Sequence, residues 1–273
     1  MSRGVFAVVL LLASAAAAKC SPDGLFVFPT AGSVIPTNSR FILEGVGKEK
    51  ARVERLSQHA AESGEDLVLK AVDDVVIVKL GKTKGVDYWT SDMNRVAVVL
   101  TPNRPLIPHR QYTLLIDKLL PGYQMLNDTG MDTMTWTTGG NPDKSIKDPN
   151  DPRLTGVDKT APKYQVKPAV AEGYYRKDSN ESYLKLRTTL AEEAAAYFVV
   201  TLKRARGASA EQRYPVPING GEASVGHDAC SGSFVFEDGR AYKMTIETFD
   251  SAGNKCTEVL KPIEVQAPRP GLQ

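Results

Sequence analysis

The segment ETFDSAGNKC, residues 247–256, places Asp250, Asn254 and Cys256 close together around a small, flexible centre. Two oxygen ligands and a thiol could begin a metal site, but calcium needs about six to eight oxygen ligands. The same residues suit a turn between strands, because Gly253 and Asn254 accept positive φ and Asp250 can bind the backbone amides that follow. We therefore expect an Asx-type turn and no metal here.

His227, Asp228 and Cys230 form a second cluster, in the segment GHDAC. A histidine beside a thiol could make a nucleophile, but an oxidised cysteine has no thiolate to activate. The sequence lacks zinc-ligand spacings, a G-x-S-x-G elbow, a phosphate-binding glycine loop and H-E-x-x-H. We expect no catalytic residue, metal or cofactor, although paired carboxylates for glycoside cleavage stay open because they need not be neighbours in the chain.

Aromatic side chains in the segments DYW, PGY and GYY are candidates for ligand binding. Tyr and Trp on the loops of a β-sandwich can bind sugars or proteins. The alternative is that they cover the end of a core. The candidates are the Tyr-Trp pair of DYW, assigned to positions 89 and 90, together with Tyr123, Tyr174 and Tyr175.

Residues 1–18 have the layout of a secretory signal peptide, with one positive charge at Arg3 and an apolar run over 5–12. The run is shorter than the roughly 20 apolar residues that span a bilayer, so cleavage is favoured over a membrane anchor. We expect export to the periplasm, cell surface or medium, with no transmembrane segment after cleavage. Cys20 is a candidate for lipidation, although the residues before it match the bacterial lipoprotein box poorly.

Composition limits the partners and the redox state. The formal net charge of +2 gives no electrostatic reason to expect nucleic acid or an acidic membrane surface. An exported protein meets an oxidising compartment, so we expect a disulfide between Cys230 and Cys256.

Short runs rich in Val, Ile, Thr, Leu and aromatic residues, punctuated by Gly, Pro, Asn and Asp, predict β-strands throughout the mature chain. In the first part the predicted strands cover 40–45, 66–72, 75–81, 95–102, 111–117 and 133–139. In the second part they cover 163–170, 182–190, 197–205, 213–219, 232–239, 241–250 and 257–265. One strand alternates clearly, with Tyr242, Met244, Ile246 and Thr248 on one face.

Between the two sets of strands, residues 140–160 are rich in Pro, Gly and charged residues and predict a linker. The predicted fold is all-β, with one domain over 22–139 and a second over 161–267. A linker of about twenty residues predicts no fixed cleft between the two domains.

Two stretches, PTAGSVIPTNSRFIL (29–43) and LIPHRQYTLLIDKLLPGYQMLNDTGMDTMTWTTG (106–139), resemble bacterial Ig-like domains of the surface-layer type. The second part is similar to another bacterial Ig-like pattern, through DKTAPKYQV and the final D-x-A-G-N turn. The chain departs from the family after the first core strand, so residues 45–66 are expected to be a decoration. The matching positions in the first part are Pro29, Gly32, Pro36, Leu106, Pro108, Tyr112, Leu114, Ile116, Asp128, Gly130, Trp136, Thr137, Thr138 and Gly139.

The resemblance implies two tandem immunoglobulin-like β-sandwich domains in a non-catalytic secreted or envelope-associated protein. Its role would be binding, adhesion or structural spacing, with an unknown envelope protein or polysaccharide as partner. Two alternatives stay open. One is a carbohydrate-active enzyme or accessory module whose site lies in 45–66, and the other is a periplasmic pilus-type chaperone.

Overall fold

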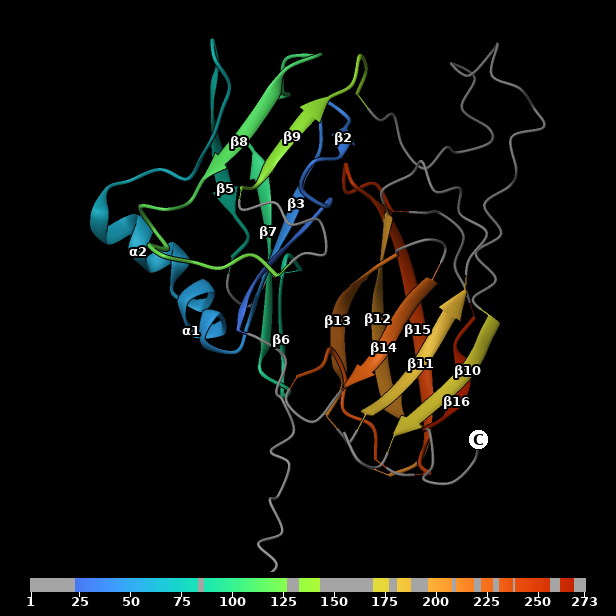
Figure 1. The fold of residues 1–273 in the computed structure, drawn as a ribbon. Coiled ribbons are helices and arrows are strands. Elements are labelled where there is room, and N and C mark those ends of the chain that lie inside the picture. Colours follow the sequence, from blue (N-terminus) through green and yellow to red (C-terminus); the bar gives the residue numbers. More distant parts are fainter. Residues whose placement is uncertain are drawn as a thin grey trace, which may run out of the picture.

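Strands make up most of the regular structure in the computed structural model, with two short helices near the start (Figure 1). The structure describes residues 23–82, 86–126, 133–142, 169–176, 181–187, 196–207, 210–218, 222–227, 231–237, 239–255 and 261–267. We call the described residues up to 142 the first half and those from 169 the second half.

The first half is built around a sheet of nine strands in the order β1-β3-β7-β5-β4-β8-β9-β2, with β6 beside β7. Most neighbours are antiparallel, but β2 and β9 are parallel. The strands are β1 (Gly24–Phe28), β2 (Val34–Ile35), β3 (Phe41–Val46), β4 (Val68–Lys70), β5 (Val75–Leu80), β6 (Tyr88–Ser91), β7 (Arg95–Pro102), β8 (Gln111–Leu115) and β9 (Thr135–Thr138).

The sheet of the first half folds over on itself at β5 and encloses a core. One end of β5 pairs with β7 and the other end pairs with β4, so this strand belongs to both layers. Side chains from the two layers meet in one buried cluster, in which the rings of Phe41 and Trp136 lie 4.5 Å apart. The Trp136 indole also donates a hydrogen bond of 2.9 Å to the carbonyl of Pro29.

The segment expected to be a decoration forms the two helices, α1 (Lys48–Glu54) and α2 (Leu56–Ser63). Its residues are mostly good helix formers, and Val53 lies near the end of α1 whereas Leu56 begins α2. Both side chains are buried in the core of the first half. The helices lie on the side of the first half that faces away from the second half (Figure 1).

The second half contains two sheets, β10-β11-β14 and β13-β12-β15-β16, and all paired neighbours in them are antiparallel. The alternation predicted for 241–250 is confirmed, since Tyr242, Met244, Ile246 and Thr248 are buried. The strands are β10 (Ala169–Arg176), β11 (Glu181–Arg187), β12 (Ala196–Arg204), β13 (Gln212–Pro217), β14 (Glu222–His227), β15 (Ala241–Asp250) and β16 (Ile263–Gln266).

The strand predicted over 232–239 is wrong. Its apolar residues do alternate, and Phe234 and Phe236 are buried. The Val235 backbone nevertheless bonds to a side chain and not to a neighbouring strand, because the Gln212 amide both accepts from the Val235 amide at 2.7 Å and donates to its carbonyl at 2.9 Å. The strand that pairs with β11 is β14, which the sequence did not predict.

Each half contains a tyrosine whose hydroxyl accepts a hydrogen bond from a backbone amide five residues upstream. In the first half Tyr112 accepts from Ile107 at 3.0 Å, and in the second half Tyr242 accepts from Glu237 at 3.0 Å. Each tyrosine stands at the start of its strand, β8 or β15. The two hydroxyls therefore tie the preceding loops to the core at equivalent places.

We expect Tyr112→Phe to lower the free energy of unfolding by about 1–2 kcal/mol, because the Ile107 amide and the Asp74 carboxylate both lose their hydrogen bond to the hydroxyl. Urea unfolding followed by circular dichroism measures this change. Tyr88→Phe is the matched control, since no described residue bonds to the Tyr88 hydroxyl and the expected change is below about 0.5 kcal/mol. Equal effects of the two substitutions would contradict this role for Tyr112.

Candidate functional site at the junction of the two halves

Apolar side chains of the first half are buried against the core of the second half. They come from β1, β3, β6 and β7, and they face away from the core of the first half. The rings of Phe28 and Tyr197 meet edge to face at 5.5 Å, and Tyr197 stacks on Phe249 at 5.3 Å. The first-half residues in this junction cluster are Phe28, Ile42, Trp89, Ala97 and Val99.

Strand β7 explains how one sheet serves two cores. Successive side chains of a strand point to opposite faces. Val96, Val98 and Leu100 enter the core of the first half, whereas Ala97 and Val99 enter the junction cluster. The two halves thus contact each other directly, although the predicted linker suggested no fixed arrangement. Most of that linker lies outside the described residues.

A buried polar network crosses the junction beside the apolar cluster. Arg95 donates from Nη1 to Glu44 at 3.3 Å and from Nε to Ser231 at 2.7 Å. The Tyr214 hydroxyl donates to the same Glu44 oxygen at 2.8 Å. Since Glu44 and Arg95 belong to the first half, and Tyr214 and Ser231 to the second, the network links the halves.

The charged and polar groups of the network affect one another's pKa values strongly, because their side chains are mostly buried. Burial raises the pKa of the Tyr214 hydroxyl well above its ordinary value, and the charge of Glu44 raises it further. Burial alone would lower the pKa of Arg95, but Glu44 together with Tyr214 and Tyr183 outweighs burial, and the pKa of the guanidinium is raised. Arg95 therefore stays charged and Tyr214 stays a hydrogen-bond donor.

The turn between β6 and β7 makes a further contact across the junction. Ser91 donates its hydroxyl to the carbonyl of Gly232 at 2.6 Å, and the Gly232 amide donates to the carbonyl of Met93 at 3.2 Å. A side chain at position 232 would have its Cβ 2.3 Å from that of His227. Glycine is therefore needed here so that the backbone can lie against the end of β14.

Trp89 lies on β6, and the guanidinium of Arg213 from the second half lies over the face of its ring. The Arg213 guanidinium is 5.9 Å from the centre of the indole ring, and it also pairs with Glu247 at 3.0 Å. Burial would raise the pKa of Glu247, but hydrogen bonds from Lys255 and Arg213 outweigh it and lower that pKa. The Trp89 Nε1 atom is buried without a hydrogen-bond partner among the described residues. Packing against the second half therefore holds this ring in place.

The segment 250–254 forms the Asx-type turn that the sequence predicts, and it lies at the junction. The two carboxylate oxygens of Asp250 accept from the amide and the side chain of Asn254, at 2.7 and 2.8 Å. Gly253 has φ +79, as expected, whereas Asn254 does not adopt a positive φ. The Arg40 amide of the first half donates to the Ser251 carbonyl at 2.7 Å.

We expect Asp250→Ala to lower the free energy of unfolding by about 1–2 kcal/mol, because both bonds to Asn254 are lost. The melting temperature should not change when calcium is added to either protein, since the Asp250 oxygens are occupied within the turn. Asp66→Ala, at an exposed position, is the control with an expected change below about 0.5 kcal/mol. A calcium-dependent rise of several degrees would show a metal site instead.

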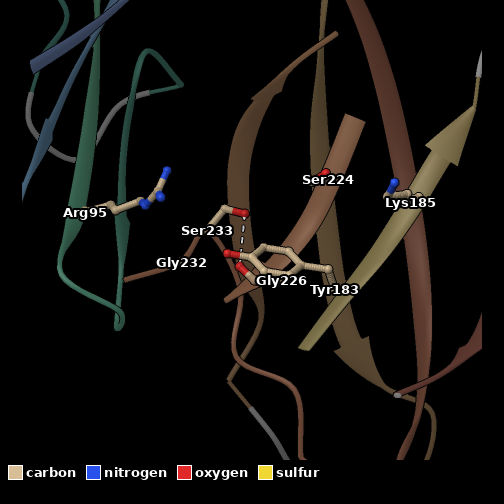
Figure 2. A pocket seen from close by; sticks show the side chains of 7 residues that line it. All are labelled: Arg95, Tyr183, Lys185, Ser224, Gly226, Gly232 and Ser233. Carbon is tan, nitrogen blue, oxygen red and sulfur yellow. Dashed lines mark hydrogen bonds between the residues drawn. The ribbon is translucent and has the colours of Figure 1, made fainter. Parts of the chain in front are cut away.

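A cavity of about 340 Å³ opens beside the polar network (Figure 2). Arg95 approaches it from the first half. The ring of Tyr183 lies beside two glycines of the second half, and Lys185 lies on the other side. The lining residues are Arg95, Tyr183, Lys185, Ser224, Gly226, Gly232 and Ser233.

The aromatic pair assigned to positions 89 and 90 in fact lies one position earlier, at Tyr88 and Trp89. The prediction of a tryptophan at position 90 is therefore wrong, because that residue is Thr90. Its side chain is exposed on β6. The pair also lies on a strand and not on a loop. Because successive side chains of a strand point to opposite faces, Trp89 is buried where Thr90 faces solvent.

The predicted ligand-binding aromatics are not gathered at one site. Trp89 belongs to the junction cluster, whereas Tyr123 is half-buried and packs against the core of the first half. Tyr174 and Tyr175 lie within β10, where the sequence predicted a loop. Ligand binding by these residues stays a prediction.

The predicted cysteine chemistry lies outside the described residues, which contain none of Cys20, Cys230 and Cys256. The disulfide and the lipidation therefore stay predictions. His227 is described and is buried at the end of β14, whereas its neighbour Asp228 lies outside.

Glu44, Arg95 and Tyr214 were missed by the sequence analysis. The available signal was a charge inside or next to an unbroken apolar run, in FILEGV and RVAVVL. Such a charge on a strand covered on both faces needs a buried partner. Sequence alone does not identify that partner.

Within the part of the chain that the structure describes, no group of three or more His, Cys, Asp or Glu side chains is placed to hold a metal ion. The helices among these residues are too short and too polar to span a membrane. Comparison of the sequence with protein-family models and with curated proteins finds no match.

Proposed function

We propose that this protein is an exported, non-catalytic protein of two tandem Ig-like β-sandwiches that acts as one rigid binding or spacing element at the cell envelope. The observation that carries the proposal is the junction, where an apolar cluster and a polar network join the halves. A fixed arrangement of two sandwiches suits a protein that presents a surface or holds a distance.

The strand arrangement supports the Ig-like assignment. In the first half, the chain leaves β1 and crosses to pair β2 in parallel with the last strand, β9, while β8 lies between β4 and β9. In the second half, sheets of three and four strands face each other across a core. The tyrosine hydrogen bonds at Tyr112 and Tyr242 match the tyrosine corner of Ig-like sandwiches.

Export is tested in the native cells. The tagged protein is followed by cell fractionation, and the mature N-terminus is determined by mass spectrometry. We expect cleavage after residue 16, 17 or 18 and recovery outside the cytoplasm. An uncleaved chain in the cytoplasm would overturn the proposal.

Binding is tested with the purified mature protein and an insoluble envelope fraction. We expect saturable co-sedimentation that excess untagged protein displaces. An unrelated Ig-like protein of similar size and charge is the control. Absence of saturable binding, or turnover of a substrate that is lost on His227→Ala while the fold survives, would contradict a non-catalytic binding role.

A further inference from the structure

The cavity beside the polar network follows from the register of β11 and β14. In this antiparallel pair Tyr183 lies opposite Gly226 and Lys185 lies opposite Ser224. Directly opposite residues share a face of the sheet. Each large side chain therefore stands beside a small residue, which leaves a hollow between the Tyr183 ring and the Lys185 stem.

The first half closes the hollow on one side. Gly232 is held against the β6–β7 turn by bonds to Ser91 and Met93, and Arg95 extends from the start of β7 to the same place. The cavity of about 340 Å³ falls within the range of about 300–1,000 Å³ for small-molecule sites. Both halves thus contribute to its wall.

The lining is rich in hydrogen-bond donors, and none of the described residues that form it carries a carboxylate. Tyr183, Ser224 and Ser233 supply hydroxyls that can donate or accept. Arg95 and Lys185 supply positive charge. A ligand that fits this chemistry carries several hydroxyls and a negative group.

Arg95 retains donors for a ligand. Its Nε donates to Ser231 and its Nη1 donates to Glu44, so Nη2 has no hydrogen-bond partner among the described residues. The side chain is 22% exposed and lines the cavity, so a ligand in the cavity can reach this donor. An anionic group placed there would form a charge-assisted hydrogen bond.

Lys185 also retains donors. Its nearest acid is Glu222 at 3.8 Å, which is longer than a hydrogen bond, and the ammonium side chain is 43% exposed. The ammonium can therefore turn toward a ligand without breaking a buried contact.

We propose that this cavity binds a sugar unit that carries a carboxylate or a phosphate. The apolar face of the sugar packs on the Tyr183 ring, and its hydroxyls bond to Ser224 and Ser233. The anionic group lies between Arg95 and Lys185. This inference rests on the proposed function, since it names the class of envelope polysaccharide that the protein would bind.

The test uses the mature protein with glucuronate, glucose 6-phosphate and glucose as probes in calorimetric or NMR titrations. We expect at least one of the two acidic sugars to bind at least about tenfold more tightly than glucose, because a charge-assisted bond is added. Preference for glucuronate identifies a carboxylated sugar, and preference for glucose 6-phosphate a phosphorylated one. Failure of both acids to bind, or binding no tighter than that of glucose, would overturn the proposal.

Two substitutions assign the binding to this cavity. Lys185→Met keeps the length of the side chain and removes its charge, so the acidic sugar should bind at least about tenfold more weakly. Lys243→Met removes an exposed lysine of β15 and should change binding by less than about twofold. Unchanged binding in Lys185→Met would place the ligand elsewhere.

The inference and the proposed function can fail separately. If the protein binds the envelope fraction but none of the acidic sugars, the cavity assignment is wrong and the proposed function stands. If it binds an acidic sugar in this cavity but is found uncleaved in the cytoplasm, the inference stands without the envelope role.

Discussion

Replacing Arg95 with alanine is expected to lower the free energy of unfolding by about 3–5 kcal/mol, because Glu44 would stay buried without its cation. The Glu44 side chain is 13% exposed, so solvent screens it only weakly. The hydrogen bond from Arg95 Nε to the Ser231 hydroxyl is lost in the same substitution. Urea unfolding followed by circular dichroism measures the change.

Two further variants test whether the loss of stability comes from the unpaired charge of Glu44 or from removing any arginine side chain. Arg110→Ala removes an arginine whose ion pair with Asp73 is about half exposed on both sides, so we expect a change below about 1 kcal/mol. Arg95→Met combined with Glu44→Gln leaves no unpaired charge and keeps an acceptor for Tyr214. The double variant should therefore be more stable than Arg95→Ala. The opposite order would show that the charge pair is not the cause.

Replacing Trp89 with alanine is expected to cost about 3–5 kcal/mol and to uncouple the two halves. The ring is buried between β6 and the second half. Without it, the Arg213 guanidinium loses its contact with the aromatic ring. We expect calorimetry to show one cooperative transition for the native protein and two for the variant, since each half keeps its own core.

The chain has only two tryptophans, which makes the experiment specific. In the Trp89→Ala variant the fluorescence comes from Trp136 alone, in the core of the first half. Its unfolding curve should coincide with only one of the two calorimetric transitions. Trp89→Phe keeps an aromatic ring under Arg213 and should retain a single transition. A single, unshifted transition in Trp89→Ala would mean that the ring does not join the halves.

Local patterns in the sequence were sufficient for most strands and for one turn. The alternation in β15 confirms that a period of two predicts which face is buried. The turn at 250–254 follows from Asp250 and Gly253, whose side-chain and backbone properties act within five residues. Such features need no knowledge of distant residues.

Two of the missed elements, β14 and the helical segment, have a different cause. Strand β14 has the sequence EASVGH, which has few β-branched residues, and its position is fixed by pairing with β11. The helices α1 and α2 were left undefined, and Val53 and Leu56 gain their stability from the core that they cover. In each case a tertiary contact decided the outcome over local propensity.

The sequence by itself determined a chain mostly of strands, the alternation within them, and a turn at Asp250, because these depend on neighbours in the chain. Tertiary structure alone decided that the halves share a buried junction. The hydrogen bonds of Arg95 to Glu44 and Ser231, and of Tyr214 to Glu44, span 51, 136 and 170 residues. No local pattern encodes partners at such distances, since Glu44 and Arg95 meet only when β3 pairs with β7, and Ser231 and Tyr214 reach them only when the two halves pack together.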